Sequence, residues 1–291
     1  MTPPSEPHSG GEPPAARTRK TFALWRVRGQ IPLWTRWILP LLPLGLLLFF
    51  YMQAAEARRL DNPMDKLLPL PADFVAAAKA SVLPNEFTGE IPIVADLKSS
   101  LAIYAVGFGS AVLFSLVFGL HVGAWPWAGN MFDPFLRFLS YLPPLALLPL
   151  VLLFLGIGAT AKTFLIFIAV AVPLTRSLVL RVEGVNERQI WNAQTLGPTP
   201  AEMIWVVIRR ITEPGFLDDV RLLIGTAWVY LIAAELIASN AGLGYRINVA
   251  SRNLNVAQIF LYIAVICLLA FLMDRSIYYI NRSRNRWADT K

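Results

Sequence analysis

The chain has 291 residues, of which 56% are hydrophobic and only 15% charged, and its mean hydropathy is +0.53. Soluble domains carry about 25% charged residues, so this composition excludes a soluble globule and predicts an all-α membrane protein. The net charge of +7 comes from basic residues that flank apolar runs and form no stripe, which argues against nucleic-acid binding and indicates a basic cytoplasmic face.

The N-terminal part is predicted to contain a tail, one span and a connection. Residues 1–36 are basic, and the first twenty are rich in Pro, Gly and Ser, so we expect a disordered cytoplasmic segment without a signal peptide. The first span is predicted from Trp37 to Ala55, because an apolar run of this length approaches the roughly 20 residues that cross a bilayer. The extracytoplasmic connection then runs to residue 96, with a short helix expected from Pro71 to Ser81.

Residues 97–281 are predicted to form the core, followed by a cytoplasmic tail at 282–291. Five further apolar runs bring the predicted number of spans to about six. The third and fourth spans are joined only by the four residues 158–161, Gly-Ala-Thr-Ala. The five runs are Ser99 to Val122, Leu142 to Gly156, Thr163 to Leu180, Leu217 to Ser239, and Val256 to Ile280.

Lys and Arg are distributed unevenly between the two sides of the membrane. If the amino terminus is cytoplasmic and the sides alternate, eighteen of the 26 basic residues belong to the cytoplasmic side and eight to the outer side. Basic residues concentrate on the cytoplasmic side of bacterial membrane proteins. An even number of spans then places both termini in the cytoplasm.

The segment 184–216 is amphipathic and charged, so it is expected outside the hydrocarbon. Ala193 is followed four positions later by Gly197, which predicts a short helix with a left-handed cap. The Pro-Thr-Pro at 198–200 predicts the start of a second helix, because proline suits a first helical turn. Two short helices that meet at a small-residue elbow form a compact projection suited to docking in a groove of a partner.

This segment resembles the EAA loop of binding-protein-dependent ABC importer permeases. The matching residues are Ala193, Leu196, Gly197, Pro214, Gly215 and Arg221. Three positions depart from the family pattern: Trp191 replaces the usual Glu, Asn192 replaces the first Ala, and Arg210 stands where a Pro is common.

Two further stretches are similar to the nitrate, sulfonate, taurine and bicarbonate subfamily of these permeases. Residues 142–158, which begin Leu-Pro-Pro-Leu-Ala-Leu-Leu-Pro-Leu, resemble its third-span signature. Residues 234–245, which contain Ala-Glu-Leu-Ile-Ala and Gly-Leu-Gly-Tyr, resemble the exit of its fifth span. The three stretches occur in the order and spacing of the family, and the resemblance covers residues 97–281.

The resemblance implies a type I ABC importer permease fold with a cytoplasmic coupling helix, in the bacterial inner membrane. It implies a homodimer that forms the translocation path for a small solute, such as nitrate, a sulfonate or bicarbonate. The implied partners are two ATP-binding subunits and an extracytoplasmic solute-binding protein. The expected ATPase-coupling residues are Trp191, Asn192, Ala193, Gln194, Leu196 and Gly197. The expected pathway or gate residues are Pro143, Pro144, Pro149, Glu235, Gly242, Gly244 and Tyr245.

The sequence contains no phosphate-binding Gly-x-x-x-x-Gly-Lys-Ser/Thr run, so ATP and Mg are expected on the partner subunit and no cofactor on this chain. His8 and His121 lie far apart without a Cys or carboxylate cluster, so we expect neither a metal site nor catalytic residues. The single Cys267 cannot form an internal disulfide.

Some alternatives stay open. An ion-gradient-driven transporter or channel would place ionisable residues inside spans, where Glu235 and Arg176 are partial exceptions. A membrane enzyme would need a carboxylate or histidine cluster, which is not evident. The prolines of residues 143–149 either kink the chain or free carbonyls to line a cavity. The small pair Gly119 and Gly123 is more typical of ordinary helix packing than of a dimer face.

Glu235 is predicted to have a structural role, because it lies near the outer end of the fifth span. We expect its carboxylate to accept hydrogen bonds from the backbone of the turn at 242–245, or to pair with Arg246 or Arg252. In either arrangement it would hold an outer gate closed.

Overall fold

The computed structural model describes residues 33–62, 67–84 and 89–289. The predicted disordered tail therefore lies outside the described residues, except for residues 33–36, which are helical and correct that prediction. The chain divides into two compact units, Met1–Ala57 and Arg58–Lys291. Helix α1, Leu33–Asp61, begins in the first unit and contains the whole of the predicted first span. Many of its leucine and phenylalanine side chains are exposed, as lipid-facing side chains would be: Leu41, Leu42, Leu46, Leu47, Leu48, Phe49 and Phe50.

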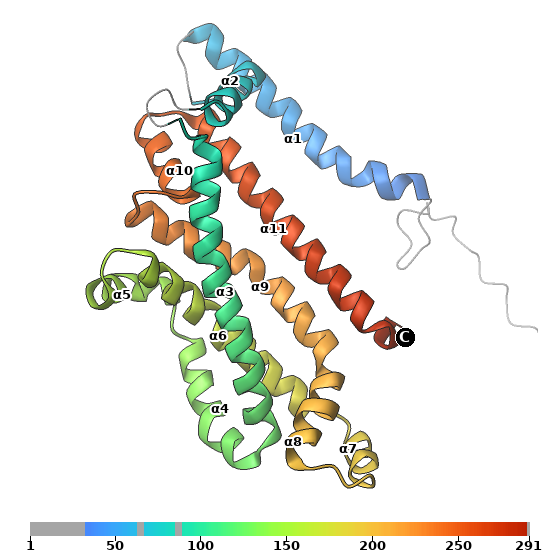
Figure 1. Cartoon of the computed structure of the whole chain (residues 1–291). Helices are drawn as coiled ribbons and strands as arrows, with labels where there is room; N and C mark the ends of the chain where they lie inside the picture. Colours follow the sequence, from blue (N-terminus) through green and yellow to red (C-terminus); the bar gives the residue numbers. More distant parts are fainter. Residues whose placement is uncertain (1–32, 63–66, 85–88, 290–291) are drawn as a thin grey trace, which may run out of the picture. The chain divides into compact units, whose positions relative to one another are not determined.

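The described part of the second unit consists of helices and helical turns, without strands. Four of the α-helices have a proline as their first residue, where the missing backbone donor has no intrahelical partner. The short helix predicted from Pro71 is confirmed. In chain order (Figure 1) the elements are α2 Pro71–Val82, α3 Pro92–Ala124, α4 Pro126–Ser140, η2 Pro144–Leu147, α5 Leu148–Leu155, α6 Ala159–Glu183, α7 Glu187–Gln194, α8 Pro200–Glu202, η3 Met203–Ile208, α9 Arg209–Ile237, α10 Leu243–Arg252, α11 Val256–Arg284 and η4 Arg286–Asp289.

Four helical runs of the described residues are long and apolar enough to cross a membrane: α3, α6, the run Pro200–Ile237 that includes α9, and α11. They contain the second, fourth, fifth and sixth predicted spans, apart from the last two residues of the fifth. The third predicted span is not a single helix. Helix α4, absent from the prediction, and the η2–α5 segment together form a pair bent by 84°, which would make a fifth span.

The bend between α4 and α5 has a local cause in the sequence. Pro143 and Pro144 lack backbone N–H groups, so the helical hydrogen-bond ladder cannot pass through them, and Pro144 instead opens the turn η2. Pro149 lies in the first turn of α5, where a proline is tolerated. The prolines therefore mark a break between helices and do not kink the interior of one. The carbonyl of Pro143 accepts the N–H of Ala146 within the turn, so that carbonyl is already used.

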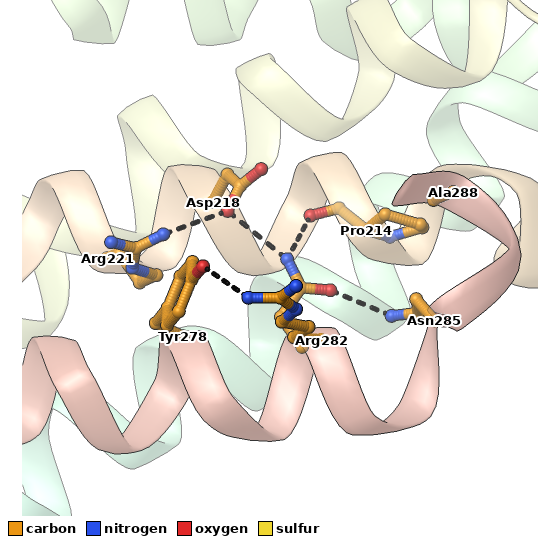
Figure 2. A pocket seen from close by; sticks show the side chains of 8 residues that line it. Pro214, Asp218, Arg221, Tyr278, Arg282, Asn285 and Ala288 are labelled. Carbon is orange, nitrogen blue, oxygen red and sulfur yellow. Dashed lines mark hydrogen bonds and ion pairs between the residues drawn. The ribbon is translucent and has the colours of Figure 1, made fainter. Parts of the chain in front are cut away.

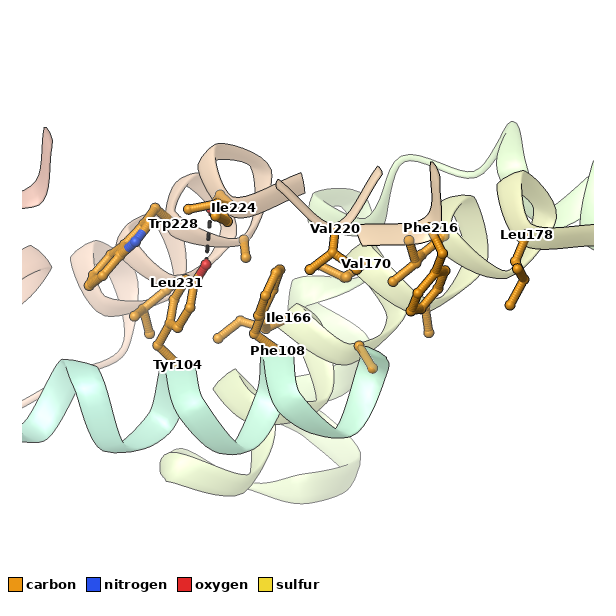
Figure 3. Close-up of a cluster of buried hydrophobic side chains, with 14 of the residues drawn as sticks. Tyr104, Phe108, Ile166, Val170, Leu178, Phe216, Val220, Ile224, Trp228 and Leu231 are labelled. Atoms are coloured by element: carbon orange, nitrogen blue, oxygen red, sulfur yellow. Dashed lines mark hydrogen bonds between the residues drawn. The ribbon is translucent and has the colours of Figure 1, made fainter. Parts of the chain in front are cut away.

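Helices α3, α6 and α9 pack against one another and form the centre of the second unit (Figure 1). Aromatic side chains fill the contact between α3 and α9 (Figure 3). The ring of Tyr104 stacks on Trp228 with centroids 4.6 Å apart and on Phe108 at 5.2 Å. The Tyr104 hydroxyl donates a hydrogen bond to the carbonyl of Ile224 at 3.2 Å. Burying a ring and satisfying its polar group in this way stabilises the crossing.

Glycines of α3 let this helix approach α6 closely. A Cβ added at Gly123 would lie 2.7 Å from the Cβ of Val182, and one at Gly119 would lie 3.1 Å from a methyl of Leu178. Small residues on one helix face bring two helix backbones together. Gly119 and Gly123 therefore act in helix packing within the chain, which is the role that the sequence pattern favoured over a dimer face.

Candidate functional site

The first candidate site is a buried polar cluster around Glu235, near the end of α9. The side chain of Glu235 is fully buried. Its Oε1 accepts a hydrogen bond from the Ser100 hydroxyl at 2.7 Å, and its Oε2 accepts one from the Gly244 N–H at 2.8 Å. The prediction that this carboxylate binds the backbone of the turn at 242–245 is confirmed.

A second carboxylate, Asp96, lies beside Glu235. It was not among the site residues expected from the sequence. Asp96 Oδ2 accepts from Arg246 Nε at 2.8 Å and from the Tyr262 hydroxyl at 3.0 Å. The alternative pairing of Glu235 with Arg246 or Arg252 is therefore wrong, because Arg246 pairs with Asp96 and Arg252 is exposed at the end of α10 and forms no ion pair with Glu235 in the described structure. One signal was available: Asp96 precedes Ser100 by four residues at the start of α3, so both side chains lie on one helix face.

Both glycines of this cluster lie where a side chain would overlap Glu235, and Gly242 is also needed for its backbone conformation. Gly242 has a φ of +112°, a conformation that other residues rarely adopt. Gly244 lies inside α10, where a Cβ would come within 2.7 Å of the Cβ of Glu235. The adjacent Leu243 N–H donates to the Ser100 hydroxyl at 2.8 Å. The Gly-Leu-Gly sequence thus lets the chain pass directly over the carboxylate, and Tyr245, the next residue of α10, is half-buried.

Lys162 adds a cation to the cluster from the first turn of α6. Its side chain is buried, and its Nζ donates to the Ser239 hydroxyl at 2.7 Å. The positive charge of Lys162 and the negative charge of Glu235 attract each other. The cluster therefore connects α3, α6, α9, α10 and α11 at one end of the second unit. Its polar groups satisfy one another, which is the requirement for burying charges.

An apolar hollow lies next to the proline break. It has a volume of about 490 Å³ and is open to the surroundings. Apolar groups alone form its surface, to which the Thr160 hydroxyl does not contribute. They come from η2, α5 and the first half of α6: Leu147, Leu150, Val151, Phe154, Leu155, Phe164 and Ile168. Pro143, Pro144 and Pro149 shape the segment that forms one wall, so these prolines are brought near an apolar surface and not into the cluster around Glu235.

The second candidate site is the elbow between α7 and α8. Asn186 caps α7, because its side-chain oxygen accepts the Arg188 N–H at 2.9 Å. Gly197 has a φ of +67°, which confirms the predicted left-handed cap. Helix α8 begins at Pro200 as predicted. Thr199 and Glu202 form a reciprocal cap there, with the Thr199 N–H donating to Glu202 Oε2 at 2.7 Å.

The elbow presents apolar side chains that the described chain does not cover. Trp191 is 60% exposed and Leu196 is 87% exposed. Asn192, Gln194 and Gly197 are also exposed, whereas Ala193 is half-buried. Large exposed apolar side chains gathered on a rigid projection indicate an interaction surface. The structure thus brings together the six residues expected to contact an ATPase.

A polar cavity of about 360 Å³ lies between the first half of α9 and the end of α11 (Figure 2). Arg221 of α9 pairs with Asp274 at 2.8 Å and with Asp218 at 3.3 Å, and its guanidinium lies over the ring of Tyr278. Asn281 of α11 donates to the carbonyl of Pro214 at 2.9 Å. These contacts connect the Pro214 to Arg221 stretch of the EAA-like pattern to the last helix.

Comparison with known proteins agrees with this arrangement. Residues 111–286 match the family described as "Binding-protein-dependent transport system inner membrane component". The taurine transport system permease protein TauC of Escherichia coli (strain K12) is 31% identical over 262 residues, which cover 90% of this chain and 94% of the relative. The chain belongs to this permease family. It is therefore a multi-pass inner-membrane protein and a permease of an ABC importer, and membership does not favour the ion-gradient alternative.

Other relatives of this permease are named for different solutes. The putative aliphatic sulfonates transport permease protein SsuC of Bacillus subtilis (strain 168) is 27% identical, over 77% of this chain and 79% of the relative. The bicarbonate transport system permease protein CmpB of Synechocystis sp. is 28% identical, over 63% of this chain and 66% of the relative. The predicted subfamily is confirmed by these similarities.

The fold of the permease matches that of a solved importer. Two inward-facing crystal forms of the MetNI methionine ABC transporter align with TM-scores of 0.55 and 0.57, at 16% and 18% identity. Each alignment covers 66% of this chain, and 97% and 96% of the respective solved chains. The predicted all-α fold of a type I ABC importer permease is confirmed, while the role of the elbow residues stays a prediction.

Proposed function

We propose that this permease carries a small oxyanion or sulfonate inward across the membrane. The proposal is supported by the solutes for which its relatives are named, which are taurine, aliphatic sulfonates, bicarbonate and nitrate. These solutes share a compact group with several oxygen atoms and delocalised negative charge. A translocation path for such a group needs hydrogen-bond donors and positive charge. It does not need to distinguish closely between the shapes of these solutes.

The elbow of α7 and α8 is the proposed docking site for a separate ATPase. The observation that carries this assignment is the exposure of Trp191 and Leu196 on a projection whose two helices are both capped. Capping makes the projection rigid, so a push from the ATPase would reach α9 through the continuous helical run that begins at Pro200. ATP and Mg would bind to that partner, and the permease itself would not be an enzyme.

The proposed assembly contains two copies of this permease, two ATP-binding subunits and an extracytoplasmic solute-binding protein, with the bilayer around the spans. The open apolar hollow between α5 and α6 supports an assembly in which further protein or lipid covers that face. The uneven distribution of the 26 basic residues supports cytoplasmic termini. The Glu235 cluster would then close the extracytoplasmic end.

Reconstitution tests this function. The permease, its ATPase and its binding protein are incorporated into liposomes, and uptake of radiolabelled taurine, nitrate and bicarbonate is measured with and without ATP. Uptake of one of these solutes that requires both ATP and the binding protein supports the proposal. Uptake that follows an imposed ion gradient without ATP contradicts it and supports a secondary transporter.

A further inference from the structure

Arg176 is a charged residue within the apolar helix α6. It is seven residues before Glu183, the last residue of the helix, which is about 10 Å along the axis at about 1.5 Å per residue. The Cα–Cβ bonds of an α-helix tilt toward its N-terminus, so the Arg176 side chain leaves the backbone in the direction of the middle of the span.

The charge of Arg176 is not balanced within the described chain. Other basic groups of α6 have partners: Arg181 makes a two-point contact with Asp219, and the Lys162 ammonium donates to Ser239. The Nε–H of Arg176 is buried and has no hydrogen-bond partner, and no ion pair joins Arg176 to a described carboxylate. A buried N–H group without a partner is costly, so this group points to a ligand.

The surroundings of Arg176 on α6 are open. Pro173 and Leu180 lie three residues before and four residues after it and are both exposed, so the three residues share one helix face. An arginine on a lipid-facing surface within a span is strongly unfavourable. This face must therefore border a water-filled space or another protein, as the path between permease copies would.

We propose that Arg176 binds the oxyanion during its passage through the permease. This inference rests on the proposed function and identifies a residue that contacts the solute. The Nε–H and one terminal N–H of a guanidinium lie parallel and can hold two oxygens of a sulfonate, nitrate or bicarbonate at once. The Nε–H of Arg176 has no partner in the described chain, so that edge can bind the solute once the side chain turns toward the path.

Charge replacement tests the proposal in the reconstituted complex, with taurine as the probe. Arg176→Gln lowers the initial rate of taurine uptake by about tenfold or more, because a charge-assisted hydrogen bond to the passing anion is lost. Arg176→Lys keeps the charge and retains more uptake than Arg176→Gln. The matched control is Arg252→Gln, which makes the same change at an exposed position at the end of α10 and leaves uptake unchanged. Equal uptake by Arg176→Gln and the unaltered complex overturns the proposal.

A chemical rescue separates binding from a structural role. Arg176→Cys is made with Cys267→Ser, because Cys267 is exposed. Aminoethyl methanethiosulfonate adds a positive charge at position 176 and restores taurine uptake, whereas the negatively charged sulfonatoethyl reagent does not. Taurine slows both modifications. If both reagents have the same effect on uptake, or neither reacts while a lipid-soluble maleimide does, Arg176 does not bind the solute.

The two tests distinguish failure of this inference from failure of the proposed function. If the unaltered complex imports none of taurine, nitrate and bicarbonate, the solute class is wrong and the assignment of Arg176 is overturned with it. If it imports one of them and the Arg176 variants import it equally well, only the role of Arg176 is overturned. Should Arg176→Gln fail to assemble, the rescue of Arg176→Cys decides.

Discussion

The carboxylate of Glu235 accepts a 2.7 Å hydrogen bond from the hydroxyl of Ser100, although 135 residues separate the two in the chain. The same hydroxyl accepts the N–H of Leu243. Ser100 therefore connects the end of α9 to the start of α10. A carboxylate that is enclosed in this way is suited to holding helix ends together, and it has little freedom to bind a passing solute.

Removal of the Glu235 carboxylate is expected to destabilise the permease. In Glu235→Ala the Ser100 hydroxyl and the Gly244 N–H lose their acceptor, at a cost of about 1–3 kcal/mol for each buried unpaired group. Glu235→Gln keeps one acceptor oxygen and the shape, so it retains much of the transport. Thermal unfolding of the purified permease and solute uptake measure the two effects.

The matched control for this pair is Glu56→Gln, a change at an exposed position of α1 that alters neither the melting temperature nor the uptake rate. If Glu235→Gln assembles and melts normally but fails to transport, the charge of Glu235 acts in the translocation path, and the structural role proposed for it is wrong.

Gly244→Ala is expected to open the same cluster by steric overlap. The new methyl group would lie 2.7 Å from the Cβ of Glu235 and 2.8 Å from the Ile232 carbonyl, so α10 must move away. Such overpacking costs about 1–3 kcal/mol and lowers the melting temperature. Gly225→Ala adds the same methyl group where no atom lies within 4 Å, so it leaves the melting temperature unchanged or raises it. Equal melting temperatures for the two variants would show that α10 does not pack as described.

Much of the fold follows from local patterns in the sequence. Pro71 predicted the start of α2, and the small-residue spacing before Gly197 predicted its left-handed conformation, because each pattern acts within a few residues. Helix α4 was missed because it is amphipathic and carries Asp133 and Arg137, so it lacks the continuous apolar run by which spans are found.

Long-range pairs could not be predicted in the same way. Asp96 and Arg246 lie 150 residues apart, and a single sequence holds no distances between its segments. Glu235 was assigned correctly to the turn at 242–245 because only nine residues separate it from Gly244, a distance that one helix end can bridge.

The contacts of Asp73 at the start of α2 should make the stability of the permease depend on pH. The Leu70 N–H donates a hydrogen bond to Asp73 Oδ2 at 2.8 Å, and Nη1 of Arg59 lies 3.1 Å from the same oxygen. Both contacts lower the pKa of the Asp73 carboxyl below its ordinary value of about 4. A lowered folded-state pKa means that this stabilisation is present above the unfolded pKa and is lost as the pH falls through the folded one. Asp73→Asn should therefore reduce the fall in melting temperature that occurs as the pH is lowered.

The control for the pH measurement is Asp289→Asn in the C-terminal turn η4, which is expected to leave the acid limb as it is. Both variants are compared from about pH 6 to pH 3, the interval in which carboxyl groups titrate. If Asp73→Asn and the unaltered permease lose stability in parallel over this interval, the capping contacts of Asp73 do not contribute to stability.

The proposed orientation predicts a labelling pattern in intact cells. Single cysteines are placed at Ala80 and Ser251, which are exposed and expected outside, and at Thr290 in the predicted cytoplasmic tail, all with Cys267→Ser. Ser81 is unsuitable because its side chain is buried. A membrane-impermeant maleimide should label the first two positions and reach Thr290→Cys only after permeabilisation. Labelling of Thr290→Cys alone in intact cells would reverse the orientation.

The elbow should lose its partner when its shape changes. Gly197→Val requires a β-branched residue at a φ of +67°, which costs about 1–2 kcal/mol and so alters the angle between α7 and α8. Ala193→Trp places a large ring on a half-buried position of the same surface. Both variants should remain in the membrane but no longer co-purify with the ATPase, and solute-stimulated ATP hydrolysis should disappear. Gly109→Val, at a position of α3 with no atom within 4 Å, keeps the ATPase. Retention of the ATPase by both elbow variants would place the coupling contact elsewhere on the permease.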